Sequence, residues 1–211
     1  MIQYHKIQTV YLRDPETNFK TLLEGQWAKP EFEWLAENQW QATEKVDGTN
    51  IRIMWDGSQV TFNGKSDNAQ IHGDLVKYLY KNFTNEKMAL QFGVEPTQVC
   101  CYGEGYGAGI QSGGYYQMAK QFILFDVKIG DVWLERPNVE DVAHGLDSAI
   151  VPIVFSGTLP ECVKYVKDGY NSFIAQTEHL AEGFVMRPMT ELFNRRGERV
   201  ITKLKYTDFA R

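Results

Sequence analysis

Short strand-like runs joined by glycine turns are the feature that most limits how this chain can fold. Residues 50–55 and 59–63 flank Asp56-Gly57, a dipeptide typical of tight hairpins. Gly130-Asp131 joins a second pair of runs in the same way. The full set of runs comprises residues 40–44, 50–55, 59–63, 99–104, 122–129, 132–134, 150–155, 183–187 and 200–205. This pattern predicts an α+β protein rich in hairpins, rather than the β-α-β alternation of a parallel sheet.

Three further segments carry helix signals. Residues 71–82 place leucine, valine and tyrosine at helical spacing. Asn138 is placed to cap a helix that runs towards residue 146. Thr158 and Glu161 form a capping box, with a proline in the first turn and Gly169 as the expected stop. We therefore expect helices between the strands rather than a purely β protein.

Composition limits the class of protein. The chain has 211 residues, enough for one large domain or two small ones. The net charge of −5 argues against a generally basic surface that binds nucleic acid, but it does not exclude a local basic groove. Three cysteines, without a C-x-x-C pair, favour a reducing compartment over a disulfide or zinc framework. The chain shows no apolar signal core or membrane-length run, so we expect a cytoplasmic protein.

The segment Glu44-Lys45-Val46-Asp47-Gly48 places a lysine between carboxylates at the end of a strand-like run. A lysine held beside other cations can lose its proton and become a nucleophile. The alternative is a solvated Lys-Asp turn, because a short motif is only a hypothesis. The segment alone leaves both interpretations open.

Further candidate residues lie downstream. Lys203 and Lys205 share one face of the last strand, which indicates either a solvated face or a bound anion. Glu182 precedes another strand and Phe125 lies inside one, where an ordinary turn carboxylate and a core ring are the alternatives. Residues 103–114 are rich in glycine but contain Tyr106 and are followed by Tyr115 and Tyr116, which favours an ordered loop near a site over a flexible spacer.

Five of these segments, in this order, resemble motifs of the covalent nucleotidyltransferase superfamily of polynucleotide ligases and mRNA capping enzymes. The matching blocks are residues 44–48, 102–104, 122–127, 182–187 and 203–205. Within that superfamily the chain most resembles the phage RNA ligase 2 family, because Asn50 stands where DNA ligases and capping enzymes usually have arginine. Asp47 departs from those relatives, which often have histidine there, while DNA ligases have aspartate.

The resemblance implies an ATP-dependent RNA ligase. Lys45 would attack the α-phosphorus of ATP to form lysyl-AMP, the AMP would pass to a 5′-phosphate, and a 3′-hydroxyl would seal the strand. A lysine has an ordinary pKa of ~10.4, so Lys203, Lys205 and a bound Mg²⁺ or Mn²⁺ would favour its neutral form. The same two lysines would stabilise the phosphate in the transition state, and Glu182 would support the metal.

The resemblance also assigns roles to residues around the nucleotide. Phe125 would stack on adenine, and Glu104 would accept a hydrogen bond from a ribose hydroxyl. Glu44 would lie near the adenine edge. Asn50 would lie near the ribose or phosphate, and Lys65 near the sugar-phosphate.

The implied architecture is a single adenylyltransferase domain over residues 1–211, of the ATP-grasp-like kind. It has two antiparallel sheets flanked by helices, with the nucleotide in the cleft between them. We expect no OB-fold or helical C-terminal domain, and an accessory protein is a possible substitute for it. The expected partner is RNA with 5′-phosphate and 3′-hydroxyl ends, with DNA as a possible acceptor and no membrane. Basic residues late in the chain could bind the strand, or could simply be solvated: Arg187, Arg195, Arg196, Arg199 and Lys205.

Other functions remain open at this stage. A DNA nick ligase or a capping enzyme that uses GTP would share the same lysine chemistry. A binding module for nucleotides or RNA ends that does not seal would share only the fold, and the intact lysines and Glu182 argue against it.

Overall fold

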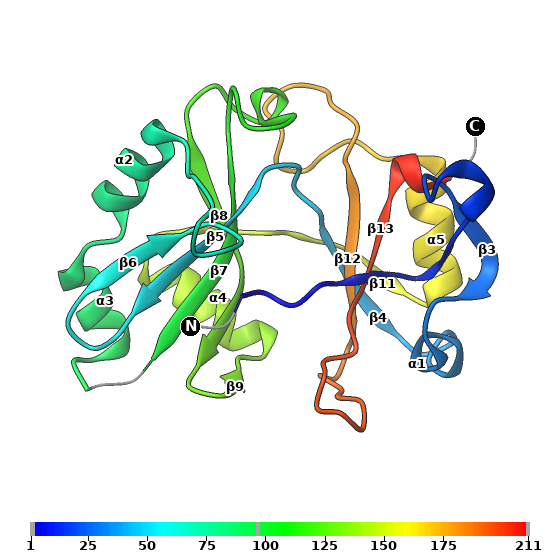
Figure 1. Cartoon of the computed structure of the whole chain (residues 1–211), viewed down its shortest axis with the longest axis horizontal. Coiled ribbons are helices and arrows are strands. Elements are labelled where there is room, and N and C mark those ends of the chain that lie inside the picture. Colours follow the sequence, from blue (N-terminus) through cyan, green and yellow to red (C-terminus); the bar gives the residue numbers. More distant parts are fainter. Residues whose placement is uncertain (1–2, 96–97, 210–211) are drawn as a thin grey trace. The chain divides into compact units, whose positions relative to one another are not determined.

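The computed structural model describes residues 3–95 and 98–209 and divides the chain into two compact units (Figure 1). Unit 1 comprises Asp47–Val151 together with the N-terminal residues through Tyr4. Unit 2 comprises His5–Val46 and Pro152–Arg211. Each unit has its own sheet and its own hydrophobic core. The prediction of a single domain over the whole chain remains a prediction.

Unit 1 is built on a mainly antiparallel sheet with the strand order β10-β8-β7-β5-β6, and β9 pairs with β8. Among the described strands of this unit, only the edge pair of β10 and β8 is parallel. Both predicted hairpins are confirmed, since β5 pairs with β6 and β8 with β9 across their turns. The strands are β5 (Thr49–Trp55), β6 (Val60–Asn63), β7 (Val99–Tyr106), β8 (Gln121–Ile129), β9 (Val132–Trp133) and β10 (Ala149–Ile150).

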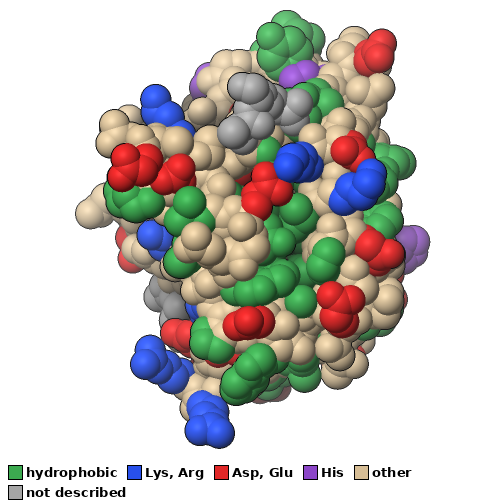
Figure 2. Space-filling view, turned by 90° about the vertical axis from the view of Figure 1, so that its right-hand side faces the viewer, with side chains coloured by type: hydrophobic (Ala, Val, Ile, Leu, Met, Phe, Trp, Pro, Cys, Tyr) green, Lys and Arg blue, Asp and Glu red, His purple; other side chains and the backbone are tan. Residues whose placement is uncertain are grey.

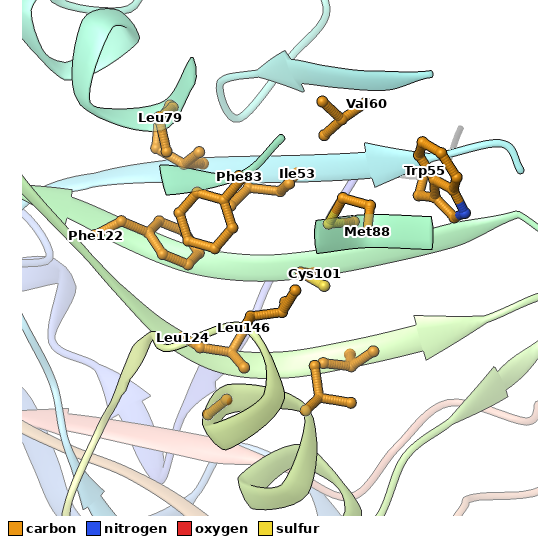
Figure 3. Packing of buried hydrophobic residues seen from close by; sticks show 14 of the residues in the cluster. Ile53, Trp55, Val60, Leu79, Phe83, Met88, Cys101, Phe122, Leu124 and Leu146 are labelled. Atoms are coloured by element: carbon orange, nitrogen blue, oxygen red, sulfur yellow. The ribbon is translucent and has the colours of Figure 1, made fainter. Parts of the chain in front are cut away.

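Three helices pack on one face of this sheet: α2 (Gly73–Asn82), α3 (Asn85–Phe92) and α4 (Arg136–Gly145). Figure 3 shows this core, in which the rings of Phe83 and Phe122 meet edge-on with centroids 5.3 Å apart. Alternate residues of β5 point into it, Ile53 among them, and their neighbours therefore face the other side. That second face carries a small cluster around Tyr102 and contains the candidate residues described below.

Unit 2 has the strand order β1-β13-β12-β4-β11, again antiparallel except for the edge pair of β1 and β13. The strands are β1 (Gln8–Thr9), β4 (Trp40–Glu44), β11 (Ile153–Gly157), β12 (Gly183–Pro188) and β13 (Thr202–Lys205), and β2 (Tyr11–Arg13) pairs separately with β3 (Leu22–Trp27). The helices of this unit are α1 (Pro30–Trp34) and α5 (Leu159–Asp168). Two sheets of this kind, with flanking helices, confirm the α+β prediction.

Short 3₁₀ turns complete the chain: η1 (Pro15–Thr17), η2 (Gly113–Tyr115) and η3 (Tyr206–Asp208). Helix α5 begins and ends where the sequence predicts. The Thr158 hydroxyl accepts from the Glu161 backbone, the Glu161 carboxylate accepts from the Thr158 backbone at 2.8 Å, and Gly169 is the C-cap. Among the described residues, no helix is long and apolar enough to cross a membrane.

Two predicted boundaries are wrong. Helix α4 begins at Arg136 with Glu135 as its N-cap, so Asn138 lies inside the first turn instead of capping it. A proline in that first turn is compatible with an earlier start, because its missing N–H is not needed there. Residues 150–155 form two strands rather than one, since Pro152 interrupts the run where the chain passes from unit 1 to unit 2.

Candidate active site

The nucleophile candidate lies at one end of three adjacent strands in unit 2. In the register of the sheet, Phe184 lies opposite Glu44 and Gly183 lies opposite Lys205. The Lys45 backbone N–H donates to the Gly183 carbonyl at 2.9 Å. Strands β4, β12 and β13 therefore bring three segments that are distant in sequence to the same end of the sheet.

Glu182 joins two of the lysines directly. Its Oε2 lies 2.5 Å from the Lys45 Nζ, and its Oε1 lies 2.6 Å from the Lys205 Nζ. The side chains of Glu182 and Lys45 are only 13% and 22% exposed, so water screens this pair weakly. The predicted grouping of Lys45, Glu182 and Lys205 is thus present in the structure.

Lys203 adds a third positive charge to this site. It is half-buried on β13 between the buried residues Thr202 and Leu204, as the predicted alternation requires. Burial lowers its pKa, and the nearby charges of Lys45 and Lys205 lower it further. Three lysines around one carboxylate leave excess positive charge, which favours a bound anion over the alternative of a merely solvated face.

Gly183 allows this close arrangement of strands. Its φ is +147°, and an added Cβ would lie 2.1 Å from the Leu204 carbonyl oxygen and 2.8 Å from the Lys205 Cα. Any larger residue would push β13 away from β12. The glycine that follows Glu182 therefore sets the distance between Glu182 and Lys205.

The Glu44 side chain is buried and holds a neighbouring loop. Its carboxylate accepts hydrogen bonds from the Ser172 hydroxyl and, at 2.8 Å, from the Phe173 N–H. The Ser172 oxygen in turn accepts from the N–H groups of Ile174 and Ala175 at 3.1 and 3.0 Å. Burial raises the pKa of Glu44, and the two hydrogen bonds partly offset that effect. The sequence contains no signal for the Ser172 contact, because it joins residues 128 positions apart.

A second contact that the sequence did not predict supports β13, the strand that carries Lys203 and Lys205. Asp208 accepts from the Lys205 N–H at 2.8 Å and from the Arg13 guanidinium at 2.8 Å. Arg13 is also among the charges that lower the pKa of Lys203. Arg13, on β2 near the N-terminus, thus adds a cation beside Lys203.

The remaining candidates belong to unit 1. Asn50 on β5 and Glu104 on β7 lie directly opposite each other in the sheet and share the face that points away from the helix-covered core. Both side chains are half-buried, and Asn50 Oδ1 is buried without a hydrogen-bond partner among the described residues. The sheet register therefore pairs an unused acceptor with a carboxylate on one surface.

Phe125 is the extra residue of a bulge in β8. Tyr102 pairs with Asp126 and Gly103 with Leu124, which leaves Phe125 without a partner in the ladder. The Phe125 ring is half-buried outside the main core and lies edge-on to Tyr4, with centroids 5.1 Å apart. This position argues against the alternative of an ordinary core ring.

Lys65 lies exposed in the loop after β6, and Arg52 fixes that loop. The guanidinium of Arg52 is fully buried and donates to the Gly64 carbonyl at 2.9 Å and to Asp67 at 2.6 Å. These contacts hold the backbone on either side of Lys65. The sequence interpretation did not single out Arg52.

The glycine-rich segment is ordered and bonded to Asp47, as the presence of tyrosines suggested. Tyr116 accepts from the Asp47 N–H at 3.2 Å, and the Asp47 carboxylate accepts from the Ser112 N–H at 3.3 Å. An added Cβ on Gly48 would lie 2.4 Å from the Gly105 carbonyl oxygen, so the turn packs closely on β7.

Metal ligands are sparse in the described part of the chain. No group of three or more histidine, cysteine, aspartate or glutamate side chains is placed to hold an ion there. Mg²⁺ typically uses one or two carboxylates together with substrate phosphates, rather than an all-protein cage. Glu182 fits a cation that arrives with a triphosphate.

Comparisons with known proteins agree with this geometry. The sequence model of the RNA ligase family matches residues 38–205, while no curated protein matches the chain. An RNA ligase of Naegleria gruberi, solved as a mutant without ligand, is similar with a TM-score of 0.67 and 15% identity, covering 98% of this chain and 56% of that one.

Two further structures of the same Naegleria ligase contain ligands. A mutant with ATP and Mn has a TM-score of 0.63 and 16% identity over 83% of this chain and 51% of that one. A mutant with AMP and Mn has a TM-score of 0.67 and 15% identity over 97% of this chain and 56% of that one. This chain therefore shares their fold and spans about half of their length.

Proposed function

This chain belongs to the RNA ligase family, and we propose that it acts as an ATP-dependent RNA ligase through a lysyl-AMP intermediate on Lys45. The observation that carries the proposal is the contact of Glu182 with both Lys45 and Lys205 beside the half-buried Lys203. The excess positive charge suits the phosphates of a nucleotide. The neighbouring cations suit a lysine that must lose a proton before it reacts.

The ion pair with Glu182 positions the nucleophile. The Glu182 carboxylate lies 2.5 Å from the Lys45 Nζ, and this ion pair holds the amine in place. Glu182 would hold a Mg²⁺ or Mn²⁺ that arrives with ATP, and such an ion would supply positive charge beside the triphosphate. Lys203 and Lys205 place two further positive charges beside the nucleophile.

Lys203 and Lys205 then serve a second purpose. As Lys45 Nζ bonds to the α-phosphorus and the bond to pyrophosphate breaks, negative charge grows on the phosphate oxygens. Lysines already held beside that position stabilise the charge without reorganisation. The desolvation of Lys203 strengthens this effect, because a half-buried cation is poorly screened.

We assign the adenosine contacts to the predicted residues. Phe125 stacks on adenine and Glu104 accepts from a ribose hydroxyl. Asn50, whose buried oxygen has no partner among the described residues, contacts the ribose or phosphate. Lys65 lies near the sugar-phosphate, and Glu44 borders the adenine edge while Ser172 and Phe173 hold it.

The proposed substrate is RNA with 5′-phosphate and 3′-hydroxyl ends, in line with the family. AMP passes from Lys45 to the 5′-phosphate, and the 3′-hydroxyl displaces AMP to seal the strand. We also propose that the chain is a single adenylyltransferase domain of a cytoplasmic protein, which cooperates with an accessory protein when it seals.

Intact mass after incubation with ATP and Mg²⁺ tests the proposal. We expect a gain of one AMP by the wild-type protein, none by Lys45→Ala, and none with GTP in place of ATP. A mass gain of one AMP by Lys45→Ala would refute the nucleophile assignment, and a GTP adduct would indicate capping chemistry. Sealing assays on nicked RNA and nicked DNA then distinguish the two acceptors, and adenylation without sealing of either is the result expected if sealing needs the accessory protein.

A further inference from the structure

A hairpin of residues 189–199 connects β12 to β13, and we call it the basic hairpin. It projects beyond the strands in Figure 1, in orange and red. Phe193 forms a bridge with Arg199, and the Asn194 N–H donates to the Glu198 carbonyl at 2.8 Å. The Asn194 side-chain oxygen also accepts from the N–H groups of Arg196 and Glu198 at 2.9 and 3.0 Å. The turn is therefore preformed by its own contacts.

The acidic residues of the basic hairpin are occupied by other partners. Glu191 bonds the buried guanidinium of Arg199. Glu198 accepts from the Asn194 amide at 2.8 Å and lies 3.5 Å from the Lys29 Nζ. The pKa of Glu198 is lowered chiefly by Asn194 and Lys29, with a smaller effect from Arg196. The tip thus presents cations whose neighbouring carboxylates already have other partners.

The exposed side chains of the basic hairpin combine positive charge with an aromatic ring. Arg195 and Arg196 are exposed at the tip. Phe193 is 53% exposed and Met189 is 59% exposed. Arginines that contact phosphates, together with aromatic faces that stack on bases, are typical of surfaces that bind single strands.

The charge of this surface can be compared with one face of unit 2. Figure 2 shows a face of that unit on which acidic and basic side chains are interspersed, while basic side chains gather at its lower edge. An interspersed surface is expected for a chain with a net charge of −5. A locally basic projection on an acidic protein attracts a polyanion at that place.

The position of the basic hairpin fits an RNA strand whose reacting end lies at Lys45, Lys203 and Lys205. It follows Pro188, at the opposite end of β12 from Glu182. At ~3.3 Å per residue, the six residues of β12 separate the two ends by about 20 Å. The tip with Arg195 and Arg196 lies seven and eight residues beyond Pro188, so an RNA strand must extend several nucleotides from Lys45 to reach it.

We propose that the basic hairpin binds the RNA strand several nucleotides from the end that reacts. Arg195 and Arg196 contact the phosphates, and a base stacks on Phe193. The inference rests on the proposed function, of which it names a substrate-binding surface.

The test compares Arg195→Ala/Arg196→Ala with the control Lys77→Ala/Lys81→Ala on α2, which removes the same charge. Binding of 5′-phosphorylated RNA is measured by fluorescence anisotropy at several salt concentrations, for a 20-nucleotide strand and a trinucleotide. We expect the arginine variant to bind the long strand about tenfold more weakly, with a salt slope reduced by about 1.4. The trinucleotide affinity and the self-adenylation of both variants should stay at wild-type values.

Phe193→Ala and Phe193→Leu test the stacking contact. Both should lower the affinity for the long strand about fivefold without changing the salt slope, because stacking is not ionic. Equal RNA binding by the arginine variant and the lysine control would overturn the proposal, as would an equal loss for the trinucleotide. Preferential binding of the hairpin to phosphatidylserine vesicles would assign it to a membrane instead. Anisotropy does not require adenylation, so failure of self-adenylation would refute the proposed function separately.

Discussion

The two units prepare for chemistry in different ways. In unit 2, Lys45 and Lys205 form ion pairs with Glu182 at the ends of three adjacent strands, and the half-buried Lys203 adds a further positive charge. In unit 1, Asn50 and Glu104 are placed by sheet register on a surface that includes aromatic rings. We therefore expect unit 2 to be sensitive to single changes of charge or strand spacing. Unit 1 should lose affinity for the nucleotide without losing the reaction.

The largest expected effect is that of Gly183→Ala in unit 2. Its Cβ would clash with the Leu204 carbonyl and separate Glu182 from Lys205, and a displacement of about 1 Å can reduce rates 100-fold. We expect self-adenylation to fall by more than about 100-fold and the Tm to fall as well. Gly25→Ala is the matched control, because Gly25 also has positive φ but nothing lies within 4 Å of its Cβ. An equal loss in the control would mean that backbone strain, rather than strand spacing, is responsible.

Lys203→Met should separate stability from activity. Burial and like charges lower the pKa of Lys203, so its charged form costs stability at neutral pH, and that cost is relieved only as the pH rises through the lowered pKa. We expect a higher Tm at pH 7 with self-adenylation reduced about 100-fold. Thermal unfolding and the rate of AMP attachment check the two parts. A lower Tm would show that Lys203 is stabilised by contacts rather than strained by burial.

Phe125→Ala tests the contrasting behaviour of unit 1. We expect ATP to bind about tenfold more weakly, because a stacked base contributes ~1–3 kcal/mol. The rate of AMP attachment at saturating ATP should change little, since Phe125 has no charge with which to stabilise the reaction at Lys45. Titration calorimetry and single-turnover kinetics measure the two effects. Phe125→Leu retains the apolar contact with Tyr4 and controls for loss of packing, and an unchanged affinity in both variants would return Phe125 to a purely structural role.

Glu44→Gln should give the smallest effect. Burial raises the pKa of Glu44, so its contribution to stability is complete below the ordinary value of 4.5 and is lost as the pH rises through the raised pKa. Glutamine removes that loss while it still accepts from the Phe173 N–H. We expect the variant to have a slightly higher Tm than wild type at pH 7.5, with the gap closing towards pH 4.5. Glu44→Ala should instead lower the Tm at every pH, because Ser172 and Phe173 lose their acceptor.

The elements that were predicted correctly from the sequence are mostly those that local residue patterns determine. Alternation and turn residues located β5, β6 and their hairpin, and the capping box located both ends of α5. Predictions failed where a longer-range context decided the outcome. The start of α4 moved to Arg136, and the run at residues 150–155 divided at Pro152 because its two halves pair with strands of different sheets.

The sequence by itself determined the kinds of groups and their order along the chain, because motif residues and strand periodicity are local properties. It therefore identified Lys45, Glu182 and the lysine pair of β13 as candidates. Only the tertiary structure decided which of them meet. The Lys45–Glu182 ion pair joins residues 137 positions apart, and the burial of Glu44 against Ser172 depends on a loop from another part of the chain. Such contacts arise from strand order and burial, which one-dimensional patterns do not encode.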